Sequence, residues 1–273
     1  MIRQPAVAGQ FYSGSVKGLK EQVESCLDLK ARKVEALGVV CPHAGLMYSG
    51  PVAGAVYSSI SEPDTFILFG PNHYGVGADF AIATEGVWTT PLGQSAVDSI
   101  LARELFKNSG SLEEDAFSQG MDHSIEVQLP FIQYLFRQAQ IVPISMKHYD
   151  AEEHFLSLCQ GIGESVAAVL SRVKSKTTIV ASSDFTHYEP QDVARRNDNA
   201  ALEAILALDE VRLFKEVAER GISMCGYAPI AAMLVACKRL GAKNGRLVKY
   251  MTSGDTTGDY SQVVGYAGVI ITK

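Results

Sequence analysis

Polar side chains that can bind metals or transfer protons follow five segments that we predict to be strands. These side chains are His43; Asn72 and His73; His148 and Asp150; Asp184 and His187; and Ser253 and Asp255. Histidine offers a neutral imidazole to metals and titrates near neutral pH, so it also suits acid/base catalysis. The chemistry to look for is therefore metal binding with proton transfer.

Three histidines, His43, His73 and His187, are predicted to share one edge of a sheet, because ligands in open α/β sheets bind beyond the carboxyl ends of the strands. This placement predicts two or three metal ligands and a proton-transfer group. A polar rim without a metal is the alternative interpretation. His148 and His154 flank the start of a helix and are interpreted as surface residues.

Strands and helices alternate along the sequence. We predict strands at 36–41, 65–69, 140–145, 177–181, 246–251 and 262–271, with a hairpin or two short strands within 79–94. Helices are predicted at 15–32, 51–60, 95–108, 126–136, 152–173, 191–206, 209–219 and 227–240. This alternation favours an α/β/α sandwich around a mostly parallel sheet, which becomes mixed if the last two strands pair antiparallel. No linker or repeat divides residues 1–273, so a single domain is predicted.

Composition excludes several classes of function. The net charge is −6 and no run of basic residues exceeds two, which argues against nucleic acid as a partner. No apolar stretch approaches the roughly 20 residues that span a bilayer, and the first residues lack the apolar region of a signal peptide. Five cysteines without a Cys-x-x-Cys pair suit reduced thiols. A cytoplasmic protein without a membrane partner is expected.

The remaining candidates each have a structural alternative. His123 follows Asp122 and precedes Ser124, an arrangement that is also typical of a helix N-terminal cap. Cys225 precedes a predicted helix, whose positive end would lower the pKa of a thiol, although a lone cysteine is more often structural.

Two motifs of well-known enzymes are absent. Ser182, Ser183, Asp184 and His187 contain the residue types of a hydrolase triad, but the glycines of a nucleophile elbow are missing around the serines. The glycine-rich segment 70–77 lacks the lysine of a phosphate-binding loop and the spacing of a dinucleotide site. No nucleotide cofactor is expected.

Six segments in order resemble the MEMO family. They are PAVAGQFY at 5–12, PHAGLMYSG at 42–50, GPNH at 70–73, DHSIEVQLP at 122–130, SSDFTH at 182–187 and MCG at 224–226. Together they extend over nearly the whole chain.

The resemblance implies an α/β/α fold like that of the class III extradiol dioxygenases, whose non-haem iron is held by two histidines and a glutamate. His43 and His73 match the two histidines, and His187 matches an acid/base histidine. His123 is similar in position to a further pocket histidine, and Asp184 resembles a partner of His187. Cys225 occupies the position of the third ligand, and a His₂Cys set is softer than a carboxylate set. Iron or copper is the implied cofactor, and ring cleavage is put in doubt.

Two functions of different classes follow from the resemblance. The first is a metal-dependent, oxygen-using or redox enzyme that acts on a small molecule, with His43, His73 and Cys225 as ligands and His187 as acid/base. The second is a non-catalytic module that binds peptides, including phosphorylated ones, in a vestigial pocket. Similarity to microbial members of the family also implies a functional link to a radical-SAM protein and an AMMECR1-type protein.

Overall fold

The computed structural model describes all residues from Met1 to Lys273. Its helices are α1 (Val16–Cys26), α2 (Leu46–Ser58), α3 (Ser99–Asn108), α4 (Leu129–Leu135), α5 (Glu153–Leu170), α6 (Gln191–Leu206), α7 (Glu210–Arg220), α8 (Tyr227–Arg239) and α9 (Gly254–Thr257). A short 3₁₀ helix at Glu126–Gln128 precedes α4. None of the helices combines the length and the apolar character that a membrane crossing requires.

The strands form two sheets. They are β1 (Ile2–Arg3), β2 (Gly38–Cys41), β3 (Thr65–Asn72), β4 (Phe80–Ile82), β5 (Val87–Thr90), β6 (Gly93–Ala96), β7 (Glu113–Glu114), β8 (Gln140–Lys147), β9 (Thr177–Ser182), β10 (His187–Glu189), β11 (Asn244–Thr252) and β12 (Val263–Thr272). The large sheet has the order β10-β12-β2-β9-β3-β8-β4-β7, with β11 paired to β12, and β1, β5 and β6 form a small sheet.

Four neighbouring strands, β2, β9, β3 and β8, are parallel and form the centre of the large sheet. The flanking strands β12 and β4 pair antiparallel with β2 and β8, so the sheet is mixed. The predicted α/β class is confirmed, and the last two strands pair antiparallel as considered, which is one of several antiparallel pairings that make the sheet mixed.

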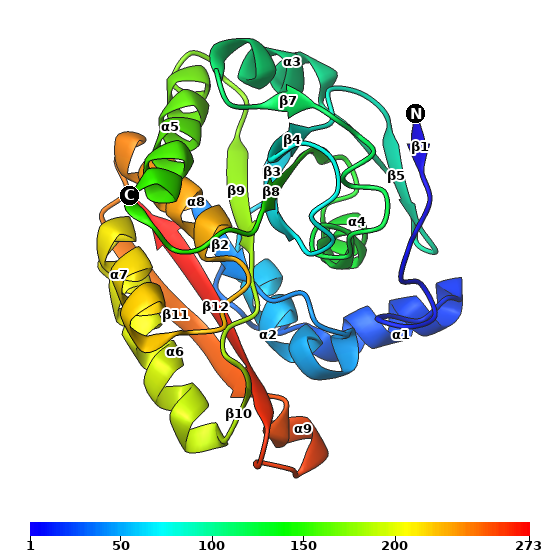
Figure 1. The fold of residues 1–273 in the computed structure, drawn as a ribbon. Coiled ribbons are helices and arrows are strands. Elements are labelled where there is room, and N and C mark those ends of the chain that lie inside the picture. The colour runs from blue at the N-terminus through cyan, green and yellow to red at the C-terminus, as the bar shows by residue number, and fades with distance from the viewer.

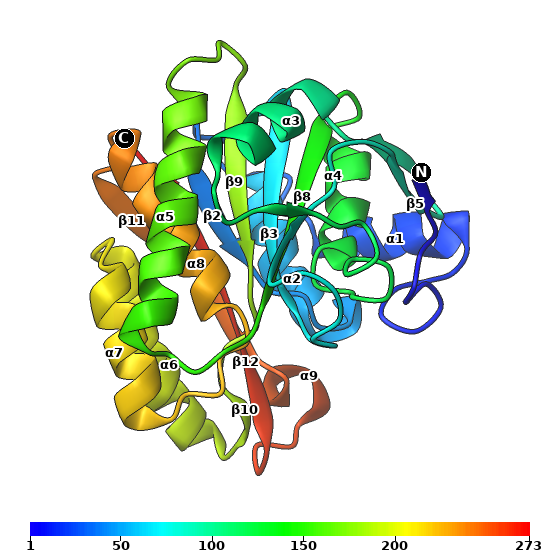
Figure 2. The same ribbon diagram turned by 45° about the horizontal axis from the view of Figure 1, so that its top comes forward.

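Helices cover both faces of the sheet (Figure 1). Helix α8 packs on β2, β3 and β9 with α5 against it, while α2 contacts β2, β11 and β12. Figure 2 shows α3, α5 and α8 in front of the sheet and α2 behind it. Because both faces are covered, the central strands are continuous apolar runs, and all eight residues of β3 are buried.

Several predicted boundaries were wrong, each for a local reason. Helix α1 begins after the Ser15 cap as predicted but ends at Cys26; Leu27 still packs against the core, whereas Leu29 is exposed and has no surface to cover. Helix α2 begins five residues before the predicted position 51, with Pro51 inside it. Residues 95 and 96, predicted to start a helix, instead end strand β6, and α3 begins only after the Asp98 cap.

The predicted interruption at Pro130 is tolerated because Pro130 lies in the first turn of α4, where a backbone N–H is not needed. The segment 79–94 contributes β4 to the large sheet and β5 to the small one. Because β2, β9, β3 and β8 are parallel, their carboxyl ends lie at one edge of the sheet, where the candidate residues are expected.

Candidate metal centre

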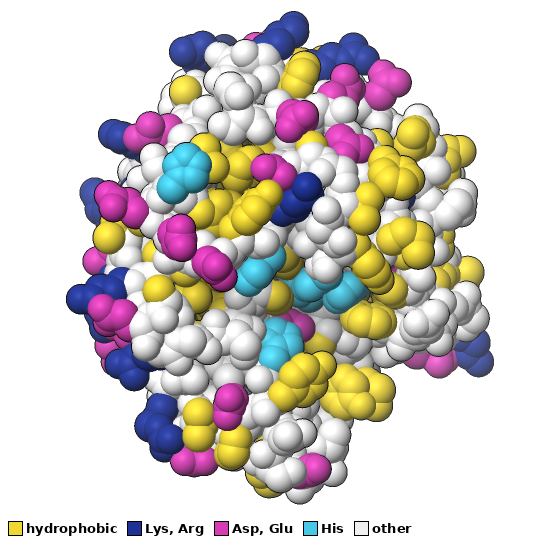
Figure 3. All heavy atoms as spheres, viewed as in Figure 1, with side chains coloured by type: hydrophobic (Ala, Val, Ile, Leu, Met, Phe, Trp, Pro, Cys, Tyr) yellow, Lys and Arg dark blue, Asp and Glu magenta, His cyan; other side chains and the backbone are white.

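Three histidines from separate segments converge at this edge. The ring nitrogens of His43, His73 and His123 lie within 4.8 Å of one another. His43 follows β2, His73 follows β3, and His123 lies in the segment before the 3₁₀ helix. Figure 3 shows histidine side chains gathered near the middle of this face of the molecule. The first two come together as predicted; His123 joins them although a capping arrangement explains its sequence equally well.

His43 is almost fully buried, and its ring orientation is fixed by Ser182. The Ser182 hydroxyl donates to the carbonyl oxygen of Ser124 at 2.6 Å, and its oxygen lies 2.8 Å from Nδ1 of His43. Since that hydroxyl hydrogen is already used, Nδ1 of His43 must be the donor. The lone pair of His43 is therefore on Nε2, the nitrogen that is available to the cluster.

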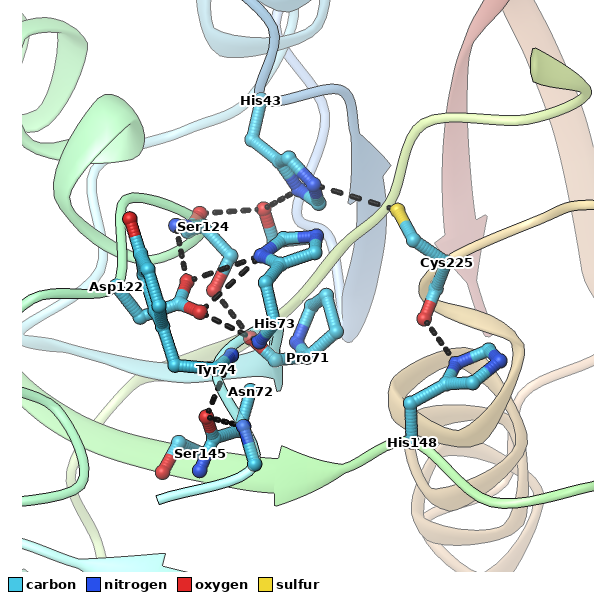
Figure 4. A network of polar contacts seen from close by, with 12 residues as sticks. His43, Pro71, Asn72, His73, Tyr74, Asp122, Ser124, Ser145, His148 and Cys225 are labelled. Carbon is cyan, nitrogen blue, oxygen red and sulfur yellow. Dashed lines mark hydrogen bonds and ion pairs between the residues drawn. The ribbon is translucent and has the colours of Figure 1, made fainter.

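His73 is oriented in the same way by Asp122 (Figure 4). Its backbone N–H donates to Asp122 Oδ2 at 2.6 Å, and its Nδ1 lies 3.1 Å from the same oxygen. An ionised carboxylate only accepts hydrogen bonds, so Nδ1 of His73 is the donor and Nε2 has the lone pair. Hydrogen bonds of this kind from a second ring nitrogen are typical of metal-binding histidines.

His123 has no hydrogen bond from its ring and is positioned by packing alone. Its ring stacks on His73 with centroids 4.7 Å apart and an interplanar angle of 11°. Phe11 lies against it at 4.5 Å between centroids, and the His43 ring meets it edge-on at 5.4 Å.

The surroundings of His43 and His123 favour uncharged imidazoles. Burial, together with the neighbouring His73 and His123, lowers the pKa of His43 well below its ordinary value. Burial and His73 lower the pKa of His123 to about 4. Burial opposes ionisation of Asp122, but hydrogen bonds from His73 and Ser124 offset it and hold the pKa of that carboxyl below its usual range. At neutral pH His43 and His123 are therefore uncharged and can offer lone pairs.

Cys225 lies beside the cluster but is not one of its three members. Its Sγ is 3.3 Å from Nε2 of His43. Burial and the nearby Asp184 raise the pKa of the thiol, so it is protonated when no cation is close. Gly226 allows this approach, because a Cβ there would lie 2.4 Å from the carbonyl oxygen of Ser182.

Asp184 is buried and faces the backbone of the His43 loop. Its Oδ1 accepts the N–H groups of His43 at 2.8 Å and Ala44 at 3.3 Å. The predicted partner, His187, instead donates from Nδ1 to the carbonyl oxygen of Ser223 at 2.7 Å. A carbonyl only accepts, so Nε2 of His187 is a free acceptor on a half-buried ring.

The other strand-end residues do not join the cluster. His148 is exposed, as predicted, and its Nδ1 lies 3.3 Å from the carbonyl oxygen of Cys225. Asp255 accepts the backbone N–H of Thr252 at 2.7 Å, and Ser253 accepts that of Val264 at 3.0 Å. These two residues therefore stabilise the turn between β11 and β12.

Sequence reasoning did not find the residues that orient the rings. The sequence pattern offers Ser182 as a candidate nucleophile and Asp122 as a candidate helix cap, and neither pattern indicates a role in orienting a histidine ring. Asp122 does accept the N–H of Ser124 at 2.8 Å, but its second oxygen binds His73. Gln128, which donates to Ser182 Oγ at 2.9 Å, gives no sequence signal because its partner is 54 residues away.

The residues present fit a metal ion. Two oriented Nε2 lone pairs, a third neutral imidazole and an adjacent thiol form a donor set of nitrogen and sulfur, which suits iron, copper or zinc rather than magnesium or calcium. The fold and the site thus define an α/β protein with a histidine-rich candidate metal centre.

Comparison with known proteins places the chain in a family. Residues 3–270 match the model of the family described as Memo-like protein. A MEMO1 family protein of Methanopyrus kandleri is 42% identical, with 100% of both chains covered. One of Methanosarcina barkeri is 45% identical, with 99% of this chain and 100% of the relative covered. The chain belongs to the Memo-like family.

A solved structure supports the fold alone. The crystal structure of an uncharacterized protein from Escherichia coli K12 superposes with a TM-score of 0.57, covering 85% of this chain and 98% of the other. The two sequences are 14% identical, so only the arrangement of helices and strands is compared.

Proposed function

We propose that this Memo-like protein binds a redox-active metal, iron or copper, and uses it in an oxidative reaction on a small molecule. The observation that supports this most is the convergence of the ring nitrogens of His43, His73 and His123 within 4.8 Å. The proposed ligands are these three nitrogens, with the Cys225 thiol beside His43 as a further donor.

Iron and copper are proposed because of the donor types and the resemblance to extradiol dioxygenases. Imidazole suits iron, copper and zinc, and a neighbouring thiol makes the set softer than one containing a carboxylate. Once bound, such a metal would supply electron transfer and interaction with oxygen. A ring-cleaving reaction is not proposed, because Cys225 stands at the position where the resemblance expects glutamate.

The residues of the chain would contribute orientation and proton transfer. Asp122 and Ser182 fix the rings of His73 and His43, so that little reorganisation accompanies binding. His187 has a free acceptor nitrogen and is the proposed acid/base residue. Its half-buried position allows exchange of protons with solvent.

Recognition of phosphorylated peptides is the weaker proposal. Phosphate is typically bound by arginine through two parallel hydrogen bonds. The contacts of the three clustered histidines involve serine, aspartate, cysteine and aromatic side chains, and none involves an arginine or lysine. The one arginine close to the segment of Asp122, Arg3, is buried and already paired with Glu126.

Metal analysis of tag-free protein tests the proposal. We expect about one iron or copper per chain after anaerobic reconstitution, measured by elemental mass spectrometry. His43→Ala and His123→Ala should both lose it. His154→Ala is the matched control, because His154 is exposed on α5 and outside the cluster. Equal metal content in His43→Ala and His154→Ala would contradict a metal centre at this site.

A further inference from the structure

One buried carboxylate, that of Glu126, gathers four residues of the N-terminal arm, residues 2–12. Glu126 is fully buried and accepts the backbone N–H groups of Ala6 at 2.8 Å and Val7 at 3.1 Å. It also accepts the hydroxyl of Tyr12 and pairs with the guanidinium of Arg3. A buried charge requires partners of this kind, and all those of Glu126 come from the arm.

Arg3 connects the arm to the segment that precedes His123. Its Nε donates to the carbonyl oxygen of Gln119 at 3.1 Å, and its Nη2 donates to that of Asp122 at 2.7 Å. Its guanidinium also lies over the ring of Trp88, 4.4 Å from the centroid. Arg3 therefore fixes the backbone of Asp122, the residue that orients His73 (Figure 4).

Phe11 connects the arm to two further parts of the cluster. Its ring packs on His123, whose ring makes no hydrogen bond. Its carbonyl oxygen accepts the N–H of Leu46 at 2.7 Å, at the start of α2 and just after the loop that bears His43. The arm thus contacts the segments of His43 and His123 directly, and it reaches His73 through Asp122.

We infer that the N-terminal arm positions the metal ligands, with Phe11 and Arg3 as positioning residues for a centre built on other elements. The inference rests on the proposed function, because its consequence is a change in metal affinity. The inference goes beyond the proposed function because it assigns a role to a segment that supplies no metal ligand. Without the ring of Phe11, the His123 ring keeps only its contacts with the other two histidines, the stack on His73 and the edge-on contact with His43.

Phe11→Ala is the first test, because Phe11 is only half-buried and its removal should leave the protein folded. Co²⁺ is the probe, since its visible spectrum reports coordination geometry. We expect the affinity to fall by about tenfold or more, as for other residues that orient ligands, and the spectrum to change. Phe11→Tyr retains the ring and should restore both. Phe106→Ala on α3 is the control, because Phe106 is also partly exposed.

A metal-free measurement separates this inference from the proposed function. Nuclear Overhauser contacts between the rings of His73 and His123 should be present in the wild type and weakened in Phe11→Ala. If the wild type binds no Co²⁺ but these contacts weaken, the proposed function fails and the positioning role stands. If Phe11→Ala retains the contacts, or binds Co²⁺ with the affinity and spectrum of the wild type, the positioning role is overturned.

Arg3→Lys provides a second, independent test. Lysine retains the charge that pairs with Glu126 but cannot donate to the carbonyls of Gln119 and Asp122 at the same time. We expect Co²⁺ affinity to fall several-fold and the emission of Trp88, the single tryptophan, to shift. Arg103→Lys on the exposed face of α3 is the control. Unchanged affinity in Arg3→Lys would contradict the positioning role of Arg3.

Discussion

The two ends of the central parallel strands differ in what they could bind. At the amino ends of β2, β3 and β9 there is a cleft of about 340 Å³, lined by residues that include Glu35, Glu62, Lys176 and Lys273. At the carboxyl ends the side chains of the histidine cluster converge and are held by oriented partners. Position on the sheet and convergence of donors therefore single out the candidate metal centre, which the volume of a cleft alone would not do.

The two ends differ because the parallel strands run in the same direction, so all their outgoing loops lie at the carboxyl ends. Loops that leave the carboxyl ends lead into helices and can place side chains over the sheet, as the loop after β2 does with His43. The charged residues at the amino ends are carboxylates and lysines of both signs, and the cleft has neither the imidazole nor the thiol donors that suit iron, copper and zinc.

The largest effect is expected from His43→Ala compared with Glu62→Gln at the opposite end. Loss of the most buried ligand should abolish stoichiometric binding of iron or copper, whereas Glu62→Gln should leave it unchanged. Isothermal titration of the two variants with the same metal measures the contrast. A comparable loss in Glu62→Gln would remove the distinction between the two ends.

Asp122→Asn should weaken metal binding without abolishing it. The change retains the shape of the side chain but removes the charge that orients Nδ1 of His73. We expect affinity to fall by about 10- to 100-fold, the effect typical of residues that hydrogen-bond a metal-binding histidine. Competition with a chelator of known affinity measures the dissociation constant of the metal. An unchanged dissociation constant would argue that His73 needs no orienting partner.

Acid should destabilise the metal-free protein through the buried histidines. The pKa of His123 in the folded state is about 4, below its ordinary value of 6.5, so the unfolded chain binds the proton more readily. The contribution of His123 to the free energy of unfolding is therefore fully present above pH 6.5. It is lost as the pH falls towards 4, by up to about 1.4 kcal/mol per pH unit. The free energy of unfolding, measured with a denaturant between pH 7 and 4.5, should fall less steeply with decreasing pH in His123→Leu than in the wild type.

Cys225→Ser should have the smallest effect of these changes. The thiol lies 3.3 Å from one ligand nitrogen but outside the cluster of three, and its raised pKa disfavours the thiolate. We expect the affinity for Co²⁺ to fall by less than about tenfold, with a loss of the sulfur-to-metal absorption band if the sulfur coordinates. Complete loss of binding would instead support the His43, His73 and Cys225 set implied by the resemblance.

The sequence predicted the framework well because it depends on local patterns. Apolar runs marked the central strands, and the rule for parallel sheets placed His43 and His73 at one edge. The role of His123 depends on packing against Phe11, which is more than a hundred residues away in the chain and follows no strand. No local pattern reports such a contact, and the orienting roles of Asp122 and Ser182 were missed for the same reason.

The most direct test of a metal centre at the carboxyl ends is anomalous diffraction from crystals of the protein loaded with Co²⁺ or Zn²⁺. If the three histidines bind the metal, we expect one strong peak about 2.0–2.2 Å from Nε2 of His43 and Nε2 of His73, with a ring nitrogen of His123 at a similar distance. A peak only among the charged residues at the amino ends, or none at full loading, would contradict it.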